Sequence, residues 1–225
     1  MSKGKIITIE GTDGTGKATQ KKRLVERLEA EGIPAYSATF PDYESKWGQK
    51  IQLHKRGQLQ GLGVEHICLL YARDREDKQE QFKQLLEQGT NIILERYIES
   101  NLAYQGSKLK GKKRKQMMDW IWTLETNVLE IKPSDYVVLL DLPIKYAADA
   151  ISKRKLETGD KRKDIYDDNL KLQKEVYNTY KLLAKQPNWT TVPCVKKGLF
   201  TSRRYTEDEL AEIIWKVIKN ILAKS

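Results

Sequence analysis

A glycine-rich segment near the start of the chain has the residue types and spacing to bind phosphate groups. It contains the G-x-x-x-x-G-K framework, with Gly11, Gly16 and Lys17 at the fixed positions. The glycines let successive backbone N–H groups converge on an anion, and the lysine reaches the β- and γ-phosphates of a nucleotide. The pattern predicts a nucleoside triphosphate site built from Gly11, Thr12, Asp13, Gly14, Thr15, Gly16, Lys17, Ala18 and Thr19.

Two positions in this segment are unusual. Ala18 stands where Ser or Thr normally places a hydroxyl on Mg²⁺, and Thr19 comes one residue late, which is a rotation of about 100° on a helix. We therefore expect Mg²⁺ to be held mainly by phosphates, water and a carboxylate elsewhere, with Thr19 as an alternative ligand. Asp13 would be repelled by a bound triphosphate unless it has another task.

The elements that position this segment alternate between strands and helices. An apolar run at 6–9 precedes the glycines and a helical pattern follows them to about Glu31, so a helix dipole adds to the phosphate site. Similar apolar runs occur at 36–40, 91–94, 136–140 and 190–195. Strands separated by helices pair in parallel. The sequence predicts an α/β fold, with a five-stranded parallel sheet covered by helices on both faces, in a single domain over residues 1–225.

Three further segments stand out. The last helix should begin with the capping-box pattern at 206–209 and dock through Leu210, Ile213, Ile214, Val217 and Ile221, which have helical spacing. Residues 42–62 and 155–164 are polar, as is typical of mobile covers, and we expect a short lid within about 154–164. Apart from its strand, the segment 186–205 receives no role.

The composition limits the possible partners. Hydrophobic residues make up 39% of the chain and charged residues 32%, and no apolar run approaches the roughly 18 residues that span a membrane. The net charge is +10, but the basic runs at 108–115 and 153–163 lack the interleaved aromatics that stack bases. Cys68 and Cys194 lie in apolar contexts, which favours reduced core thiols. We expect a cytoplasmic protein that uses small-molecule substrates, with no nucleic-acid partner and no membrane association.

Longer motifs resemble the thymidylate kinase family, a group of P-loop nucleoside-monophosphate kinases. The matching segments are Ile9-Glu10-Gly11-Thr12-Asp13, Thr39-Phe40-Pro41, Leu69-Leu70-Tyr71-Ala72-Arg73-Asp74-Arg75, Glu95-Arg96-Tyr97 continuing through Ser100-Asn101-Leu102-Ala103-Tyr104, and more weakly Leu140-Asp141-Leu142-Pro143. They cover the chain from about residue 5 to 185. The resemblance implies transfer of a phosphoryl group from ATP to dTMP with Mg²⁺, and a homodimer. Trp120, Trp122 or the pair Met117 and Met118 would lie either on the dimer face or in the core.

The resemblance also implies an acceptor site. Arg75 would approach the thymine carbonyl edge, Tyr71 would stack on the base, and Arg96 would hold the acceptor phosphate. The other implied contacts are Asp13 on the sugar 3′-hydroxyl, Phe40 and Pro41 beside the base, Ser100 and Asn101 on the base, Tyr104 in the space of a ribose 2′-hydroxyl, and Tyr166 near sugar and base. Glu95, where the family more often has Asp, is the candidate Mg²⁺ ligand, directly or through water.

The expected place of the catalytic cation depends on one position of the phosphate loop. Some members of the family carry an arginine directly after the Asp of the phosphate loop, where this chain has Gly14. We therefore expect Arg154 or Arg162 of the lid, supported by its lysines, to act with Lys17 and Arg96. The alternative is another deoxynucleoside-monophosphate kinase, for dUMP or of broad specificity, which would share the loop and lid.

Overall fold

Five parallel strands form the central sheet of the protein, in the order β2-β3-β1-β4-β5. The computed structural model describes residues 3–59, 61–147, 166, 169–198 and 202–223. The strands are β1 (Ile6–Glu10), β2 (Ala35–Thr39), β3 (Asn91–Glu95), β4 (Tyr136–Asp141) and β5 (Trp189–Pro193). In the centre, Ile9 pairs with Glu95 on one side and with Val138 on the other. The predicted parallel sheet is confirmed.

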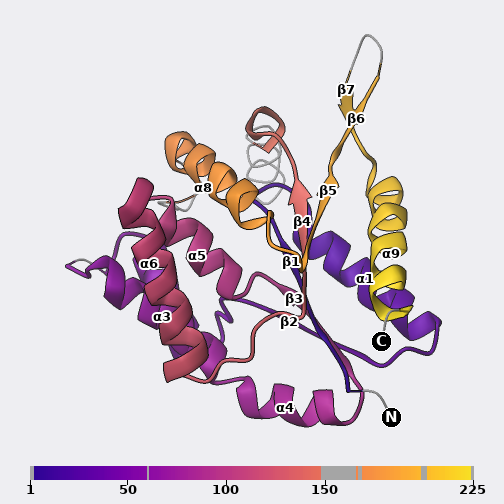
Figure 1. Cartoon of the computed structure of the whole chain (residues 1–225), viewed down its shortest axis with the longest axis horizontal. Coiled ribbons are helices and arrows are strands. Elements are labelled where there is room, and N and C mark those ends of the chain that lie inside the picture. Colours follow the sequence, from indigo (N-terminus) through magenta and orange to yellow (C-terminus); the bar gives the residue numbers. More distant parts are fainter. Residues whose placement is uncertain (1–2, 60, 148–165, 167–168, 199–201, 224–225) are drawn as a thin grey trace.

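Helices cover both faces of the sheet, as the sequence predicts (Figure 1). On one face lie α1 (Lys17–Ala30) and α9 (Glu207–Ala223). The other face carries α3 (Val64–Glu76), α5 (Ile98–Gly106), α6 (Gly111–Thr123) and α8 (Leu170–Leu183). Further helices are α2 (Lys46–Lys55), α4 (Gln79–Glu87) and a single π-helical turn, η1 (Leu124–Val128).

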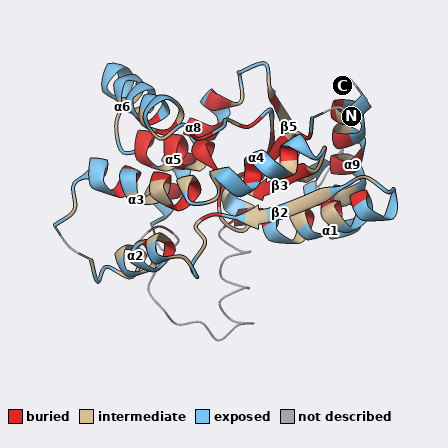
Figure 2. Ribbon diagram, turned by 90° about the horizontal axis from the view of Figure 1, so that it is seen from below, coloured by how far each residue is buried: buried red, intermediate tan, exposed pale blue. Residues whose placement is uncertain are grey.

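The central strands β1, β3 and β4 are buried because each contributes side chains to two cores (Figure 2). Side chains of a strand alternate between the faces of a sheet. Ile6 packs into the cluster under α3, α5 and α8, whereas Ile7 and Ile9 pack into the cluster under α1 and α9. All three are fully buried, as expected for a parallel sheet covered on both sides. This packing fixes the ends of the strands, where the polar residues of the site begin.

The C-terminal helix α9 has the predicted cap. Thr206 Oγ1 accepts a hydrogen bond from the amide of Glu209 at 3.2 Å, and the Glu209 carboxylate accepts from the amide of Thr206 at 2.9 Å. Of the predicted apolar stripe, Leu210, Ile214 and Ile221 are buried. Ile213 and Val217 are partly buried against the same core. The helix is therefore docked by the face that its spacing indicates.

A β-hairpin after β5 is absent from the sequence prediction. Its antiparallel strands are β6 (Val195–Lys197) and β7 (Ser202–Arg204), and they project from the edge of the sheet at which the parallel strands end (Figure 1). The amide of Tyr205 donates to the carbonyl of Cys194 at 3.0 Å, which closes the base of the hairpin. Val195, which the sequence assigns to the fifth parallel strand, belongs to this hairpin.

Helix α6 carries the methionine pair and the two tryptophans that the sequence assigns either to a dimer face or to the core. Met117 and Met118 pack against the core on their side of the sheet. Trp120 and Trp122 are each 40% exposed.

Both cysteines are buried free thiols, in agreement with their apolar contexts. No helix within the described ranges is long and apolar enough to span a membrane.

Candidate active site

The glycine-rich segment forms the loop between β1 and α1. Gly11 has φ 150°, and a Cβ atom there would lie 2.9 Å from the carbonyl oxygen of Leu140 on the neighbouring strand, so this position favours glycine. Gly16 has φ 88° and is followed directly by α1. The helix therefore points its N-terminus, with its positive dipole end and unpaired amides, at the space beside the loop.

Lys17 is folded back onto this loop. Its ammonium donates to the carbonyl oxygens of Gly11 at 3.0 Å and Thr12 at 2.8 Å, and the residue is 5% exposed. Burial and the nearby Arg96 guanidinium lower its pKa from 10.5 to about 8, although Asp13 counteracts them. A cation held at this cost beside a ring of amides is suited to a polyanion such as triphosphate.

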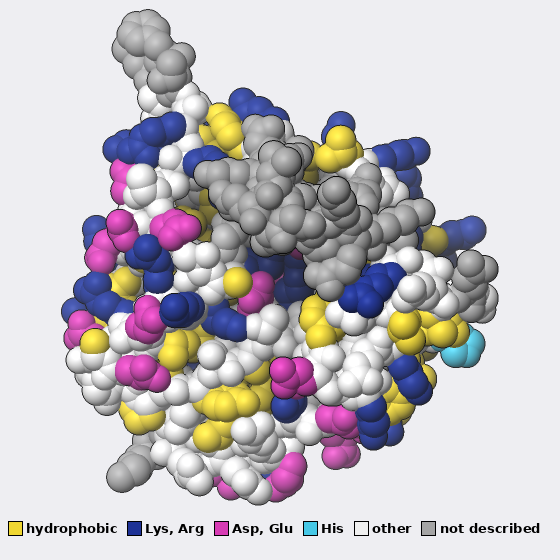
Figure 3. Space-filling model, turned by 180° about the vertical axis from the view of Figure 1, so that it is seen from behind, with side chains coloured by type: hydrophobic (Ala, Val, Ile, Leu, Met, Phe, Trp, Pro, Cys, Tyr) yellow, Lys and Arg dark blue, Asp and Glu magenta, His cyan; other side chains and the backbone are white. Residues whose placement is uncertain are grey.

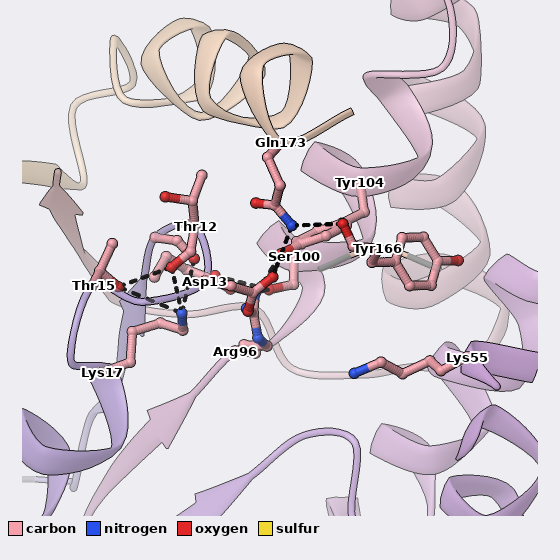
Figure 4. A network of polar contacts seen from close by, with 12 residues as sticks. Thr12, Asp13, Thr15, Lys17, Lys55, Arg96, Ser100, Tyr104, Tyr166 and Gln173 are labelled. Carbon is pink, nitrogen blue, oxygen red and sulfur yellow. Dashed lines mark hydrogen bonds and ion pairs between the residues drawn. The ribbon is translucent and has the colours of Figure 1, made fainter. Parts of the chain in front are cut away.

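Asp13 joins the phosphate loop to residues that follow β3 and to α8 (Figure 4). Its carboxylate forms an ion pair with Arg96 and accepts hydrogen bonds from Tyr104 Oη at 2.8 Å and Gln173 Nε2 at 3.0 Å. Burial by itself raises the pKa of Asp13. Arg96, Lys17, Lys55 and the Tyr104 hydroxyl outweigh that effect and hold this pKa well below its usual range. Asp13 is therefore an anion in a predominantly cationic site.

Arg96 is held in a strained conformation. Its φ is 61°, which is rare for a residue with a side chain and is typical of functional sites. Its Nη1 donates to Ser100 Oγ at 3.3 Å, and its guanidinium lies over the Tyr104 ring at 5.2 Å. The turn after β3 thus directs one guanidinium group toward the phosphate loop.

Glu10 holds the turn after β3 in place through hydrogen bonds. It is fully buried, and its carboxylate accepts hydrogen bonds from the amide of Tyr97 at 2.9 Å, Ser100 Oγ at 2.8 Å and Tyr180 Oη at 2.7 Å. The Ser100 hydroxyl, expected on the base, therefore donates to Glu10 and accepts from Arg96 in this structure. Glu10 ends an apolar strand directly before the glycines, and that position is the sequence signal that could have revealed it.

A cavity lies beside Asp13 and Arg96. It is lined by Asp13, Phe40, Pro41, Lys55, Tyr71, Arg75, Arg96, Ser100, Asn101, Tyr104, Gln105 and Tyr166. This set contains every acceptor-side residue that the sequence predicts, together with Lys55 and Gln105. In the face shown in Figure 3, charged side chains of both signs are spread over the surface around the described elements.

One end of the cavity is built on a buried ion pair. Arg75 is 1% exposed, and its Nε and Nη2 bond the two carboxylate oxygens of Glu125 at 2.7 and 2.6 Å. Asn101 Nδ2 donates to Glu125 Oε1 at 2.8 Å and to the Cys68 carbonyl at 3.2 Å. These two acceptors fix the orientation of the Asn101 amide, and its Oδ1 is buried with no partner among the described residues. Arg75 therefore offers donors, and Asn101 an acceptor, to a ligand.

Tyr166 lies at the other side of the cavity. Its ring meets the Tyr104 ring edge-on at 5.6 Å between centroids, and its hydroxyl lies 3.1 Å from His54 Nε2. Gln173 Nε2 donates to the Tyr166 carbonyl at 3.1 Å. Tyr166 is thereby tied to the Asp13 cluster through Gln173.

Glu95 is the carboxylate at the end of β3 nearest the phosphate loop. Its Oε2 accepts from Thr39 Oγ1 at 3.3 Å and lies 3.8 Å from Lys21 Nζ. No cluster of three or more His, Cys, Asp or Glu side chains able to hold a metal exists in the described part of the chain. Glu95 is a single carboxylate beside the phosphate loop, and oxygen ligands of this kind suit Mg²⁺.

The predicted lid and its two arginines, Arg154 and Arg162, lie outside the described residues. Three side chains of this site had no motif to reveal them: Lys55, Glu125 and Gln173. Glu125 and Gln173 lie on helices far along the chain from the loop, and only the folded sheet brings them to the site. The sequence signal for Gln173 was its spacing: it lies on the same face of α8 as the buried apolar residues Val176 and Leu183, although its own side chain is polar.

Comparisons with known proteins agree on one family. The thymidylate kinase family model matches residues 9–198. The thymidylate kinase of Plasmodium falciparum is 31% identical over 195 residues, which are 87% of this chain and 84% of that protein. A probable thymidylate kinase of Thermococcus gammatolerans is 33% identical over 190 residues, 81% of this chain and 84% of that protein. The solved thymidylate kinase of Candida albicans superposes with a TM-score of 0.75 at 25% identity, covering 98% of this chain and 93% of that one.

Proposed function

Since the chain belongs to the thymidylate kinase family, we propose that its cavity binds dTMP, that its glycine loop binds ATP, and that Asp13 aligns the two. The enzyme is a nucleoside-monophosphate kinase that phosphorylates dTMP. The observation that supports this use of the site is the shared residue, because Asp13 belongs to the loop and also lines the cavity. Two substrates on either side of one carboxylate are close enough for in-line phosphoryl transfer, which depends mainly on positioning.

In this proposal the base is read at the Glu125 end of the cavity. Arg75 donates to a thymine carbonyl, and Asn101 Oδ1 accepts the N3–H of thymine. Tyr71 stacks on the ring, with Phe40 and Pro41 beside it. Cytosine presents an amino group and an unprotonated N3 in these places, so each contact would be lost.

The sugar and phosphate lie toward the loop. Asp13 bonds the 3′-hydroxyl, Tyr104 fills the space that a ribose 2′-hydroxyl needs, and Tyr166 packs over the sugar. Arg96 receives the acceptor phosphate, with Ser100 holding its guanidinium. Lys55, which lines the same cavity, adds positive charge on this side.

On the donor side, residues 11–19 cradle the ATP phosphates and Lys17 moves from the loop carbonyls onto the β- and γ-phosphates. Glu95 holds Mg²⁺ directly or through water, after exchanging its contact with Lys21; the ion would neutralise charge on the transferring group. Arg154 or Arg162 completes that neutralisation from a lid within about 154–164. We further propose a single kinase domain over residues 1–225, acting in the cytoplasm.

A coupled ADP-release assay over dTMP, dUMP, dCMP and dGMP tests the substrate. We expect the highest kcat/KM with dTMP, and a Lys17→Ala variant should lose turnover with every acceptor. A preference for dUMP would instead support the alternative deoxynucleotide kinase.

The sugar contact has its own test. Tyr104→Ala should raise the kcat/KM for ribothymidine monophosphate relative to dTMP, because it opens volume beside C2′. An unchanged ratio would remove Tyr104 from this role.

A homodimer is the assembly we propose. The support on this chain is α6, whose Trp120 and Trp122 are each 40% exposed on a helix that covers the sheet. Aromatic side chains are enriched in the cores of interfaces.

A further inference from the structure

The C-terminal hairpin brings an arginine to the phosphate loop. Arg204 ends β7, and its Nη2 donates to the carbonyl oxygen of Gly14 at 3.2 Å. The two residues are 190 positions apart in the chain. Gly14 has no side chain of its own at this point of the loop, so the guanidinium group of Arg204 occupies the rim of the triphosphate site.

The neighbouring arginine has a different task. Successive side chains of a strand point to opposite faces, which separates Arg203 from Arg204. Arg203 bonds both carboxylate oxygens of Glu209 at 2.7 Å and so ties the hairpin to the cap of α9. Arg203 therefore anchors the hairpin to α9, whereas Arg204 contacts the phosphate loop.

Among the described residues the Arg204 guanidinium has no carboxylate partner, and it makes a single hydrogen bond there, to the Gly14 carbonyl. The guanidinium group has five N–H donors, so most of its capacity is unused. Its surroundings are already cationic. Lys17 and Arg204 both act on the thiol of Cys194, and both oppose the burial that raises the pKa of this thiol to about 12. A second cation at this place is stabilised when a multiply charged anion binds.

We propose that Arg204 belongs to the donor-nucleotide site, and that its guanidinium transfers from the Gly14 carbonyl to the phosphate oxygens of the bound triphosphate. The exchange replaces a bond to a neutral carbonyl by a charge-assisted one, which is stronger and can be bidentate. The hairpin, which the sequence leaves without a role, is on this inference the element that holds this cation over the loop. The inference rests on the proposed use of the loop for ATP.

Binding measurements on the full-length enzyme test it without turnover. A non-hydrolysable ATP analogue and inorganic tripolyphosphate would be titrated by calorimetry into the parent, Arg204→Ala, Arg204→Lys and Arg203→Ala. We expect Arg204→Ala to weaken both ligands by ~10-fold or more, as the loss of a charge-assisted bond predicts. Arg204→Lys should recover part of the loss because it keeps the charge. Arg203→Ala, the matched control, should stay within about twofold while lowering the melting temperature.

Three results would overturn the proposal. Arg204→Ala could bind both ligands as the parent does, or Arg203→Ala could lose as much affinity, which would indicate a general need for the hairpin. A loss for the ATP analogue without a loss for tripolyphosphate would place Arg204 on the base instead of the phosphates. Because the parent's activity on dTMP is measured separately, failure of the proposed function would leave these results interpretable.

Discussion

At the scale of single residues, the Lys17 ammonium should set the upper pH limit of the free enzyme. Its pKa is lowered to about 8 by burial and by Arg96. The quantity kcat/KM for ATP reports ionisations of the free enzyme, so it should fall about tenfold per pH unit above pH 8. A constant value of kcat/KM up to pH 10 would contradict this. In an active Lys17→Arg variant, kcat/KM should not fall above pH 8, because arginine stays charged.

The same ionisation affects stability in the opposite direction. The pKa of Lys17 in the folded protein lies below its ordinary value of 10.5. The unfolded state then binds more protons between about pH 8 and 10.5, so the free energy of unfolding contributed by this residue rises with pH in that window. Urea titrations of the parent and Lys17→Met at pH 7.5 and 10 would measure this. The free energy of unfolding of the parent should rise relative to that of Lys17→Met between the two pH values.

Glu125 positions Arg75 and Asn101, the two residues that we propose to read the base. Glu125→Gln leaves Arg75 buried beside a neutral amide, and breaking a buried pair typically costs ~3–5 kcal/mol of stability. If Glu125 had only a structural role, this loss of stability would be the whole effect of the substitution. We expect in addition that kcat/KM for dTMP relative to dCMP falls at least tenfold while the KM for ATP stays within twofold.

The control for that experiment is Glu175→Gln. It removes the partly exposed ion pair with Arg114, in which the Glu175 side chain is 30% exposed, and should cost less than about 1 kcal/mol. If Glu125→Gln lowers stability without changing the preference among bases, Glu125 has only a structural role.

At the scale of elements, the cap of α9 can be tested by itself. Thr206→Ala removes the side-chain acceptor for the Glu209 amide and should lower the free energy of unfolding by ~1 kcal/mol. Thr206→Ser, which keeps the hydroxyl, should behave like the parent. Equal stabilities of the alanine and serine variants in urea would show that the cap contributes little.

The sequence predicted long, apolar elements well and short polar ones poorly. Each of the five parallel strands lies within about two residues of its predicted range. The central strands β1, β3 and β4 were identifiable because a strand that is buried on both faces is a mainly apolar run. The hairpin strands β6 and β7 are three residues long and mainly polar or basic, so their pattern resembles that of a loop. The π-helical turn that carries Glu125 likewise has no periodic signal.

The site follows the same division. Residues in motifs, such as Arg75, Arg96 and Tyr104, were identifiable because several lie close together in the chain, and the structure places them around one cavity. Their partners Glu125 and Gln173 come from distant helices and depend on how those helices pack. The lid residues Arg154 and Arg162 lie outside the described residues and stay predictions.

At the scale of the whole molecule, the proposed homodimer can be tested through α6. The double variant Trp120→Glu with Trp122→Glu places charge at both exposed tryptophans and should convert a dimeric parent to a monomer in sedimentation velocity experiments. Leu182→Glu on α8, where Leu182 is 46% exposed, is the control and should stay dimeric. A parent that sediments as a monomer would remove the proposal.

The position of Asp13 has a consequence for the order and strength of substrate binding. Its carboxylate is part of the phosphate loop and also holds Arg96, Tyr104 and Gln173. In the proposed function an acceptor phosphate competes with Asp13 for Arg96, so an event in one pocket alters the electrostatics of the other. Thermodynamic reciprocity then requires that each nucleotide change the affinity of its partner by the same factor. Calorimetric titrations of dTMP with and without a bound ATP analogue, and the converse pair, would measure that factor. Asp13→Asn should bring it toward unity, since the common anion would be gone.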